Sequence, residues 1–415
     1  MGKKMRVEKN IRENTFQSGK KPSKDKPKPK PQASKPQQQP SSSSADTNAP
    51  PPLPLPVQQR LLSSFNAAFK PVLTSDTFPA LLQEVKAALY ARDFNAAFTS
   101  ARPEALDAYA ARWSPTRALG YAAVLLGIGE HLAADVHRDV VPGAGDLADK
   151  PAGPSGGDGA SGDDDQDAPG GKDVASPSAA DEASTTGAQK SIKMLSIGGG
   201  AAEIGAFAAY ISQQEDPSLT GTIASLDSAP WNKAVSELHG ALTVPPPLPQ
   251  YANAAARASN AAVVQPERLS STFTQQDVIL MTQQQLSQSL GDEPLLVTLL
   301  FTLNELYTTA GIGKTTSFLL NLTATIPHGS LLLVVDSPGS YSEAAVGKES
   351  KKYPMQWLMD HTLLKKTEKD AVEGCRWEKL ESHDSIWFRL ADSLKYPISL
   401  ENMRYQMHLY RATKP

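Results

Sequence analysis

A glycine-rich turn between a short apolar run and an alanine-rich run restricts the fold of this chain more than any other feature. Residues 194–197 are apolar and bounded by turn residues, which predicts a short buried strand. Gly198, Gly199 and Gly200 follow, and residues 201–210 have the pattern of a packed helix. Such a turn presents backbone N–H groups to an anionic or hydroxylated ligand at a helix N-terminus. Glycine suits it because a Cβ would block the ligand and because a tight turn can require positive φ.

The turn alone does not identify a cofactor. The spacing of Gly198, Gly200 and Gly205 departs from the dinucleotide-binding fingerprint, which has its third glycine two residues earlier. An ordinary tight turn in another kind of α/β domain is the alternative. We expect Gly205, on the new helix, to let that helix pack closely onto the strand.

Asp227 supports the cofactor interpretation. It ends a second predicted strand, residues 222–226, and lies 27 residues after Gly200. A carboxylate at this position of a βαβ unit can accept both hydroxyls of an adenosine ribose. The alternative is a cap for the predicted helix at residues 231–238.

Polar residues also follow the later predicted strands. Residues 295–303 and 331–335 are continuous apolar runs, which suit parallel strands covered on both faces by helices, and residues 273–278 form a plausible third strand. The polar residues at the ends of these strands are Asp277, Asn304, Glu305, Asp336 and Ser337. Ligands of open α/β sheets bind outside the carboxyl ends of the strands. The sequence therefore predicts one crevice at that edge.

One tempting motif does not fit. Residues 311–315, GIGKT, look like the end of a P-loop, but the pattern requires glycine at position 308, which is Thr308. The seven histidines are scattered without metal-ligand spacing, so we expect no metal site.

Composition divides the chain into four parts. Residues 1–56 carry 12 Lys and Arg against four acids in a Pro-, Gln- and Ser-rich context, which predicts a disordered basic arm. In residues 57–140 the apolar residues recur at helical spacing, which predicts a helical module. Its scattered arginines could bind RNA or belong to an ordinary solvated face. Residues 141–190 carry ten acids against three lysines and read as a disordered Gly/Ser/Asp linker. Residues 191–415 form the α/β domain.

Length, cysteine count and hydropathy limit the class of protein. The single cysteine, Cys375, excludes an intrachain disulfide, and no run approaches the ~20 apolar residues of a membrane span. We expect a soluble intracellular protein that does not contact a membrane.

The α/β domain resembles class I S-adenosylmethionine-dependent methyltransferases. It is most similar to the fungal family that methylates N3 of a uridine in large-subunit (25S) ribosomal RNA. The stretches that carry this resemblance are LSIGGGA (195–201), LFTLNELY (300–307), VDSPGSYS (335–342), KYPMQWLMDH (352–361), YPISLENMRYQMHLY (396–410) and, in the helical part, WSPTRAL (113–119).

The resemblance implies a Rossmann-like, seven-stranded, mostly parallel sheet with an antiparallel last strand, preceded by the helical module. It implies a nuclear, nucleolar enzyme that acts on pre-ribosomal RNA in the pre-60S particle. Gly198, Gly199, Gly200 and Asp227 would hold the methionine and ribose parts of the cofactor, and Asp277 the adenine amine. Asn304, Glu305 and Asp336 are our candidates for the base and the orienting groups, since N3 of uracil must lose a proton before it can accept a methyl group.

Two other functions remain open from the sequence. The glycine turn and Asp227 also suit a nicotinamide-dependent oxidoreductase, although Tyr341 and Tyr353 lack the lysine four residues later that such enzymes use. A catalytically inactive RNA-binding ribosome assembly factor is the other alternative.

The basic arm generates the first prediction. Deleting residues 1–56 should weaken RNA binding without changing sequence preference, and should flatten the log–log salt dependence by about 0.7 per lost phosphate contact. Binding titrations across a salt series measure that slope. An unchanged slope, with unchanged cellular location, would mean that the arm is only a solvated tail.

Overall fold

The computed structural model describes residues 52–139, 189–339, 341–346, 349–364 and 375–414. The expected basic arm and acidic linker lie outside these residues, apart from a few positions at their edges. No helix in the described ranges is long and apolar enough to cross a membrane.

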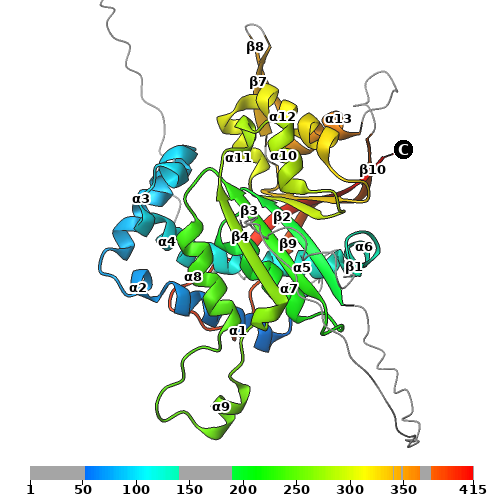
Figure 1. The fold of residues 1–415 in the computed structure, drawn as a ribbon. Helices are drawn as coiled ribbons and strands as arrows, with labels where there is room; N and C mark the ends of the chain where they lie inside the picture. The colour runs from blue at the N-terminus through cyan, green and yellow to red at the C-terminus, as the bar shows by residue number, and fades with distance from the viewer. Residues whose placement is uncertain (1–51, 140–188, 340, 347–348, 365–374, 415) are drawn as a thin grey trace, which may run out of the picture. The chain divides into compact units, whose positions relative to one another are not determined.

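A twisted sheet forms the centre of the described part of the chain (Figure 1). Its path of seven strands runs in the order β4-β3-β2-β5-β6-β10-β9, and the short β1 pairs with β2 outside this path. The strands of this sheet are β1 (Arg138–Asp139), β2 (Lys190–Ile197), β3 (Thr220–Asp227), β4 (Leu269–Gln275), β5 (Leu296–Leu300), β6 (Leu331–Asp336), β9 (Arg376–Phe388) and β10 (Met403–Thr413). A separate hairpin contains β7 (Tyr341–Val346) and β8 (Glu349–Pro354).

The strand directions confirm the expected class I methyltransferase topology. Strands β2 to β6 are mutually parallel in the sheet, whereas β10, the last strand of the chain, is antiparallel to both β6 and β9. Strand β9 therefore points the same way as β2 to β6. The third strand, β4, begins and ends earlier than we expected, and Asp277 lies two residues beyond it.

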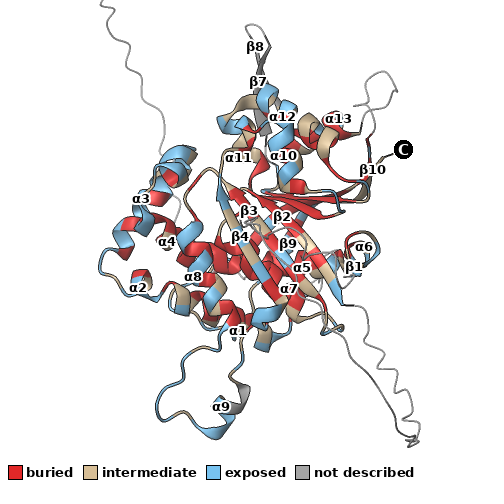
Figure 2. Ribbon diagram, viewed as in Figure 1, coloured by how far each residue is buried: buried red, intermediate tan, exposed pale blue. Residues whose placement is uncertain are grey.

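Helices cover both faces of this sheet, which explains the apolar runs of its central strands. Strands β5 and β6 are buried along their whole length. Figure 2 shows much of the sheet in the colour of buried residues. Successive β6 residues alternate between two hydrophobic clusters: Leu333 and Val335 belong to one, and Leu332 and Val334 to the other. The two clusters are the two faces of the sheet.

The helices divide between these faces. The first cluster is covered by α1 (Leu55–Ala68), α2 (Lys70–Leu73), α3 (Phe78–Tyr90), α4 (Pro103–Arg112), α5 (Ser114–Gly127), α6 (Gly129–Asp135), α7 (Ala201–Ser212) and α8 (Asn232–Thr243). The second is covered by α10 (Gln283–Leu290), α11 (Leu303–Thr309), α12 (Gly311–Thr325) and α13 (Met355–Leu363). The remaining elements are α9 (Ala254–Ser259), one π-helical turn η1 (Asn95–Thr99), and the 3-10 turns η2 (Pro266–Arg268) and η3 (Val278–Leu280).

The P-loop-like residues begin helix α12, which follows another helix and not a strand. This placement confirms that they do not form a phosphate-binding loop of that type.

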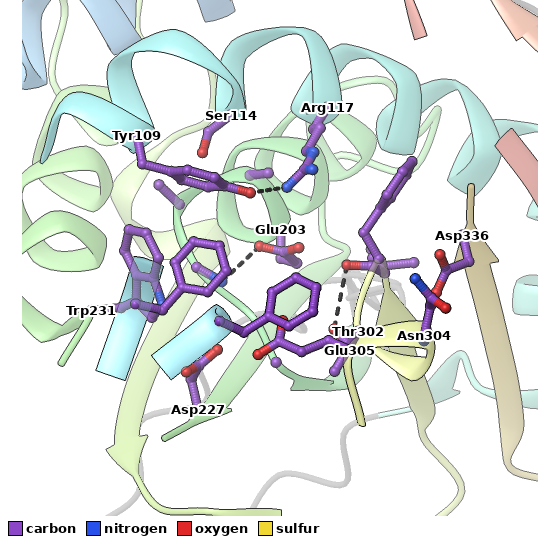
Figure 3. A pocket seen from close by; sticks show the side chains of 18 of the residues that line it. Tyr109, Ser114, Arg117, Glu203, Asp227, Trp231, Thr302, Asn304, Glu305 and Asp336 are labelled. Atoms are coloured by element: carbon purple, nitrogen blue, oxygen red, sulfur yellow. Dashed lines mark hydrogen bonds between the residues drawn. The ribbon is translucent and has the colours of Figure 1, made fainter. Parts of the chain in front are cut away.

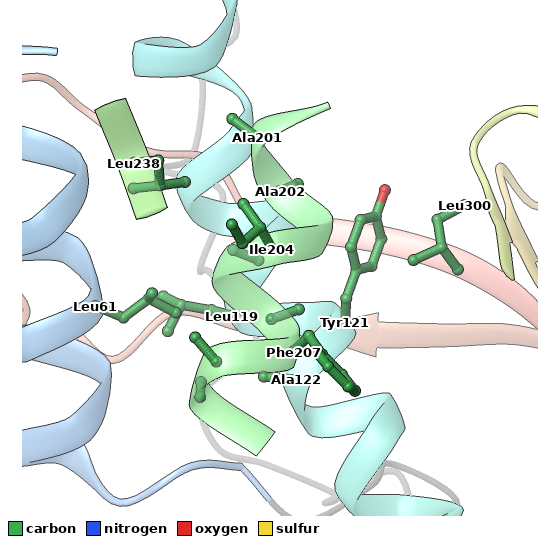
Figure 4. Close-up of a cluster of buried hydrophobic side chains, with 14 of the residues drawn as sticks. Leu61, Leu119, Tyr121, Ala122, Ala201, Ala202, Ile204, Phe207, Leu238 and Leu300 are labelled. Carbon is green, nitrogen blue, oxygen red and sulfur yellow. The ribbon is translucent and has the colours of Figure 1, made fainter. Parts of the chain in front are cut away.

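The N-terminal helices share one hydrophobic core with the α/β part of the chain. Leu61 of α1, Leu119 of α5 and Phe207 of α7 lie in the same cluster (Figure 4). Helix α5 also packs on the sheet beyond α7, where Gly120 lies against Phe388 and Met403. These helices are therefore the layer that covers one face of the sheet.

Gly205 fixes how closely α5 approaches α7. A Cβ built at Gly205 would lie 3.2 Å from Cβ of Ala118 and 3.1 Å from the ring edge of Phe65. We expected this glycine to allow packing onto the strand, and that expectation was wrong: the missing side chain faces α5 and α1. The reason is that Gly205 lies on the outer side of α7, toward the added helical layer.

This contact generates the second prediction. Gly205→Val should lower the free energy of unfolding by about 1–3 kcal/mol, because the added methyl groups overpack the α5–α7 contact. Gly240→Ala in α8 is the matched control, since its Cβ would meet nothing within 4 Å; it should raise stability by up to about 1 kcal/mol through helix propensity. Urea denaturation measures both. Equal stabilities for the two variants would contradict the close approach of α5.

Candidate active site at the carboxyl edge of the sheet

The predicted crevice exists as two neighbouring cavities at the carboxyl ends of the parallel strands. Figure 3 shows the side chains that line the larger one. The larger has a volume of about 210 Å³, and the predicted site residues that line it are Gly198, Gly200, Asp227, Asn304, Glu305 and Asp336. The smaller, of about 40 Å³, is lined by Asp277 together with Gly198, Asp227, Thr302 and Glu305. Gly199 lies between two of these residues in the turn but lines neither cavity.

The glycine turn has the geometry that its sequence requires. Gly198 has φ of +72°, and its missing side chain faces Thr302, so that a Cβ would lie 2.3 Å from the threonine side chain. Gly200 precedes α7, and its N–H donates a 2.8 Å hydrogen bond to Oε2 of Glu203 in the first turn of that helix. The N-terminus of α7 is thus partly capped by the chain's own carboxyl group.

Glu203 is a site residue that we did not identify from the sequence. The available signal was its position three residues after Gly200, which is the position of the acidic residue in a capping box. Burial raises the pKa of Glu203 to about 7, against the opposing effects of backbone hydrogen bonds and the charge of Arg117. This residue therefore titrates near neutral pH.

Asp227 combines a turn-capping role with an oxygen that faces the cavity. Its Oδ1 accepts a 2.7 Å hydrogen bond from the N–H of Ala229, and the described residues provide no partner for Oδ2. Burial, with smaller contributions from the charges of Glu203 and Asp277, raises its pKa to about 7. Asp277 likewise caps a turn, since its Oδ1 accepts the N–H of Ile279 at 2.9 Å.

Asp336 holds the start of α11, the helix that carries Asn304 and Glu305. The Asp336 carboxylate is almost completely buried, at 2% exposure, and accepts the N–H of Asn304 at 3.0 Å and that of Ser337 at 2.7 Å. Because carboxylates near a helix N-terminus interact favourably with its dipole, this contact stabilises the first turn of α11.

Asn304 and Glu305 offer polar groups that the described residues leave without hydrogen-bond partners. Oδ1 of Asn304 is buried and accepts no hydrogen bond, a costly arrangement that suggests a missing partner. The Glu305 carboxyl also forms no side-chain hydrogen bond in the described part of the chain. Burial raises its pKa to about 8, together with the charges of Asp227 and Asp336 and against the opposing charge of Arg117.

The N-terminal helices and α8 provide the opposite wall of the larger cavity. Its aromatic side chains pack together: the ring of Phe98 lies 5.0 Å from that of Tyr109 and 6.1 Å from that of Trp231 between centroids. Phe94 and Ser114 line the same wall. This wall was not predicted, because all of these residues except Trp231 come from the segment that the sequence pattern assigned to a separate helical module.

Arg117 is the cation of the described cavity lining. Its guanidinium donates a hydrogen bond to the hydroxyl of Tyr109 and lies 4.7 Å from the ring centroid of Phe301. Phe301 itself has φ of +60°, which is unusual for a residue other than glycine and is characteristic of functional sites. The sequence had offered the arginines of this segment as RNA contacts or as a solvated face, and Arg117 instead lies at the cavity.

Comparison with known proteins identifies the family. The family described as "Putative SAM-dependent methyltransferase" matches residues 65–411. The chain belongs to this family of S-adenosylmethionine-dependent methyltransferases. It is 29% identical over 350 residues to the 25S rRNA (uridine(2843)-N(3))-methyltransferase of Saccharomyces cerevisiae, an alignment that covers 79% of this chain and 76% of the yeast protein.

Solved methyltransferase structures also match parts of the chain. An O-methyltransferase family 2 protein from Planctomyces limnophilus is 12% identical with a TM-score of 0.28, and the match covers 53% of this chain and 50% of that one. The N-methyltransferase NodS from Bradyrhizobium japonicum, in complex with S-adenosyl-L-homocysteine, is 10% identical with a TM-score of 0.25, covering 54% and 78%.

The residues at the two cavities fit S-adenosylmethionine. The turn at Gly198 and Gly200 has no side chains to obstruct a ligand, and Asp227 keeps one carboxylate oxygen available. The carboxyl groups of Glu203, Asp227 and Glu305 suit a ligand of net positive charge. The described residues contain no group of three or more side chains that could hold a metal ion.

These carboxyl groups generate the third prediction. Binding of S-adenosylmethionine near pH 7 should release protons, because its positive charge favours the ionised forms of groups whose pKa lies at about 7 to 8. S-Adenosylhomocysteine lacks the sulfonium charge and should release fewer. Calorimetry in buffers of different ionisation enthalpy measures the proton count. Equal release with both ligands, or proton uptake, would contradict this electrostatic description.

The same shifts fix the sign of the pH dependence of stability. The folded protein holds these protons more tightly than the unfolded chain does, so the contribution of these three carboxyl groups to the stability of the ligand-free protein falls as the pH rises from 4.5 towards 8. His408, whose pKa is lowered to about 4 by burial, acts in the opposite direction at the acidic end of this range. Bound cofactor should offset part of that loss.

Proposed function

We propose that this protein methylates N3 of a uridine in large-subunit (25S) ribosomal RNA. Membership of the methyltransferase family gives the reaction class, and the yeast relative's name suggests the acceptor. The observation that carries the proposal is the pair formed by Glu305, a buried carboxyl without a hydrogen-bond partner, and Asn304, a buried amide oxygen without one. Methylation of uracil N3 requires a proton acceptor, which the Glu305 carboxyl can be, and the Asn304 amide can hydrogen-bond the polar edge of the base.

When bound, S-adenosylmethionine supplies a methyl group activated by its positively charged sulfur. We assign the methionine part to Gly198, Gly199 and Gly200, the ribose hydroxyls to Asp227 and the adenine amine to Asp277. The free Oδ2 of Asp227 and the position of Asp277 in the smaller, adjacent cavity support this assignment.

The acceptor base occupies the part of the larger cavity between α11 and the aromatic wall. Because N3 lies on the Watson–Crick edge, the uridine must be unpaired, and a base turned out of its stack can pack against aromatic rings such as Phe98 and Tyr109. Glu305 takes the N3 proton as a general base. Its raised pKa makes it a stronger proton acceptor than an ordinary carboxylate, and the positive charge of the cofactor helps to keep it ionised.

Removal of the proton leaves a uracil anion whose negative charge is shared by O2 and O4. Asn304 and Arg117 both line the cavity, and we assign the N–H groups of the Asn304 amide and of the Arg117 guanidinium to these oxygens; such interactions gain strength as the charge develops. Asp336 acts as a positioning residue, because it orients α11 through the N–H of Asn304.

The two alternative functions receive less support. Membership of a methyltransferase family does not favour a nicotinamide-dependent oxidoreductase, and the unpaired polar groups at the cavity do not favour an inactive assembly factor. The finer parts of the proposal, a nucleolar location and action on the pre-60S particle, follow from the proposed ribosomal substrate.

The direct test is methyl transfer from labelled S-adenosylmethionine to 25S ribosomal RNA, followed by nucleoside mass spectrometry. The product expected is 3-methyluridine. Methylation of another nucleoside, or none by protein that binds the cofactor, would overturn the proposal.

The fourth prediction concerns Glu305. Glu305→Gln should lower the single-turnover rate at saturating cofactor by roughly 10²–10⁴-fold, because the proton acceptor is lost, and should lower cofactor affinity far less. The wild-type rate should rise with pH and level off once Glu305 is ionised, at or below its pKa of about 8. The variant rate should continue to rise with hydroxide concentration, as spontaneous ionisation of N3 replaces the base. A pH–rate profile identical to that of the wild type would remove Glu305 from proton transfer.

A further inference from the structure

A cluster of one tryptophan and two arginines lies at the carboxyl edge of the sheet, outside the cavities. The side chain of Trp387, near the end of β9, is 38% exposed. The guanidinium carbon of Arg389 lies 5.2 Å from its ring centroid, and that of Arg404, on β10, lies 5.7 Å away. We call these three residues the Trp387 cluster.

The position of the Trp387 cluster follows from strand register. Trp387 pairs with Arg404, and Gln406, two residues further along β10, pairs with Asp336 at the end of β6. Strands are ~4.8 Å apart with a rise of ~3.3 Å per residue, so the cluster lies on the order of 12 Å from Asp336 along the sheet edge. Asp336 lines the larger cavity. The Trp387 cluster therefore lies close to the cavity in which we place the acceptor base.

The ring of Trp387 is exposed because neither helical layer reaches it. Ile386 and Phe388, its neighbours in β9, point into the core on the α5 side. Trp387 thus points to the opposite face, where Gln356 of α13 contacts Ser382, five residues earlier in β9. Helix α13 covers the middle of β9 and leaves its end open.

Neither arginine of the cluster forms an ion pair with a described residue. Several other cations of the described chain are paired: Arg112 with Glu401, Lys379 with Asp360, and Arg411 with Asp135. Among the described residues, no carboxylate lies within ion-pair distance of Arg389 or Arg404. Arg404 is held in place by the hydroxyl of Ser385, which accepts a 2.8 Å hydrogen bond from its Nε.

We propose that the Trp387 cluster binds the single-stranded RNA that flanks the target nucleotide. Unpaired bases stack on aromatic rings and guanidinium planes, and phosphates bind free arginines; this cluster supplies all of these partners. Single-stranded RNA fits better than a duplex because the acceptor uridine must itself be unpaired. The choice of RNA rests on the proposed function, whereas the test below measures binding and not methyl transfer.

The test compares variants of the full chain for affinity to a fluorescein-labelled single-stranded oligouridylate across a salt series. Trp387→Ala should lower affinity roughly tenfold through lost stacking, without changing the salt slope. The double variant Arg389→Gln, Arg404→Gln should flatten the log–log slope by about 1.4, which is twice about 0.7 per phosphate contact. The corresponding double change to lysine should restore the slope. The basic arm contributes equally to every variant, so it cancels from these differences.

Two control variants lie at the other end of the sheet. Lys190→Gln removes an exposed cation at the start of β2, and Tyr251→Ala removes an exposed aromatic ring from the segment between α8 and β4. Both should bind the oligonucleotide as the wild type does. All variants should keep the melting temperature and the S-adenosylmethionine affinity of the wild type, since none of these residues contacts the cavities.

Three results would overturn the proposal. The first is unchanged RNA affinity and an unchanged salt slope in the Trp387 and arginine variants, and the second is an equal loss of RNA affinity in the two control variants. The third is competition by an RNA duplex of the same length that displaces the labelled oligonucleotide as well as the single strand does. If the wild type forms no 3-methyluridine, the proposed function is overturned, whereas the proposal that the Trp387 cluster binds RNA is not affected. In the methylating enzyme, loss of the cluster should raise KM for RNA and leave kcat unchanged.

Discussion

The close packing of α5 on α7 is the interaction on which the active site depends. Gly205 has no side chain, so α5 approaches α7 to the point where Ala118 and Phe65 fill the space that a Cβ would need. Arg117 precedes Ala118 on α5, and Glu203 lies two residues before Gly205 on α7. The contact that builds the core therefore also brings a cation and a carboxyl group together above the glycine turn. A longer distance between the helices would place Arg117 away from the cavity.

The buried carboxyl groups of this site lower the stability of the folded protein. Burial is the largest cause of the raised pKa of Glu203, Asp227 and Glu305, and Arg117 offsets it for Glu203 and Glu305 without removing it. A chain selected for stability alone would fill this space with apolar side chains. The unpaired Oδ1 of Asn304 adds to the same cost. Such features are expected where binding of a cationic cofactor and a polar base completes the interactions.

Local signals predicted the parts of the site that single segments build. The strand, glycine turn and helix around Gly198 are contiguous, and polar residues after apolar strands must meet at one sheet edge, so Asp227, Asn304 and Asp336 were found from the sequence. The side chains of the opposite wall were not. Tyr109 and Arg117 reach the cavity through helix packing between segments far apart in the chain, and nothing in their local spacing separates them from a solvated face. Likewise, the hydrogen bond from the N–H of Asn304 to Asp336 depends on the relative positions of two strands.

The N-termini of the two helices at the cavity explain why the site suits S-adenosylmethionine better than a dinucleotide. In a dinucleotide-binding enzyme the first N–H groups of the helix after the glycine turn hold a pyrophosphate. Here the N–H of Gly200 already donates to Glu203, and that of Asn304 donates to Asp336. A pyrophosphate would have to displace carboxyl groups from these N–H groups and would meet further carboxyl groups at Asp227 and Glu305. A cofactor whose one anionic group is a carboxylate and whose net charge is positive is opposed much less by these acidic residues. The same glycine turn, which leaves both cofactors open on sequence alone, therefore discriminates between them through the acidic residues that cap the helices behind it.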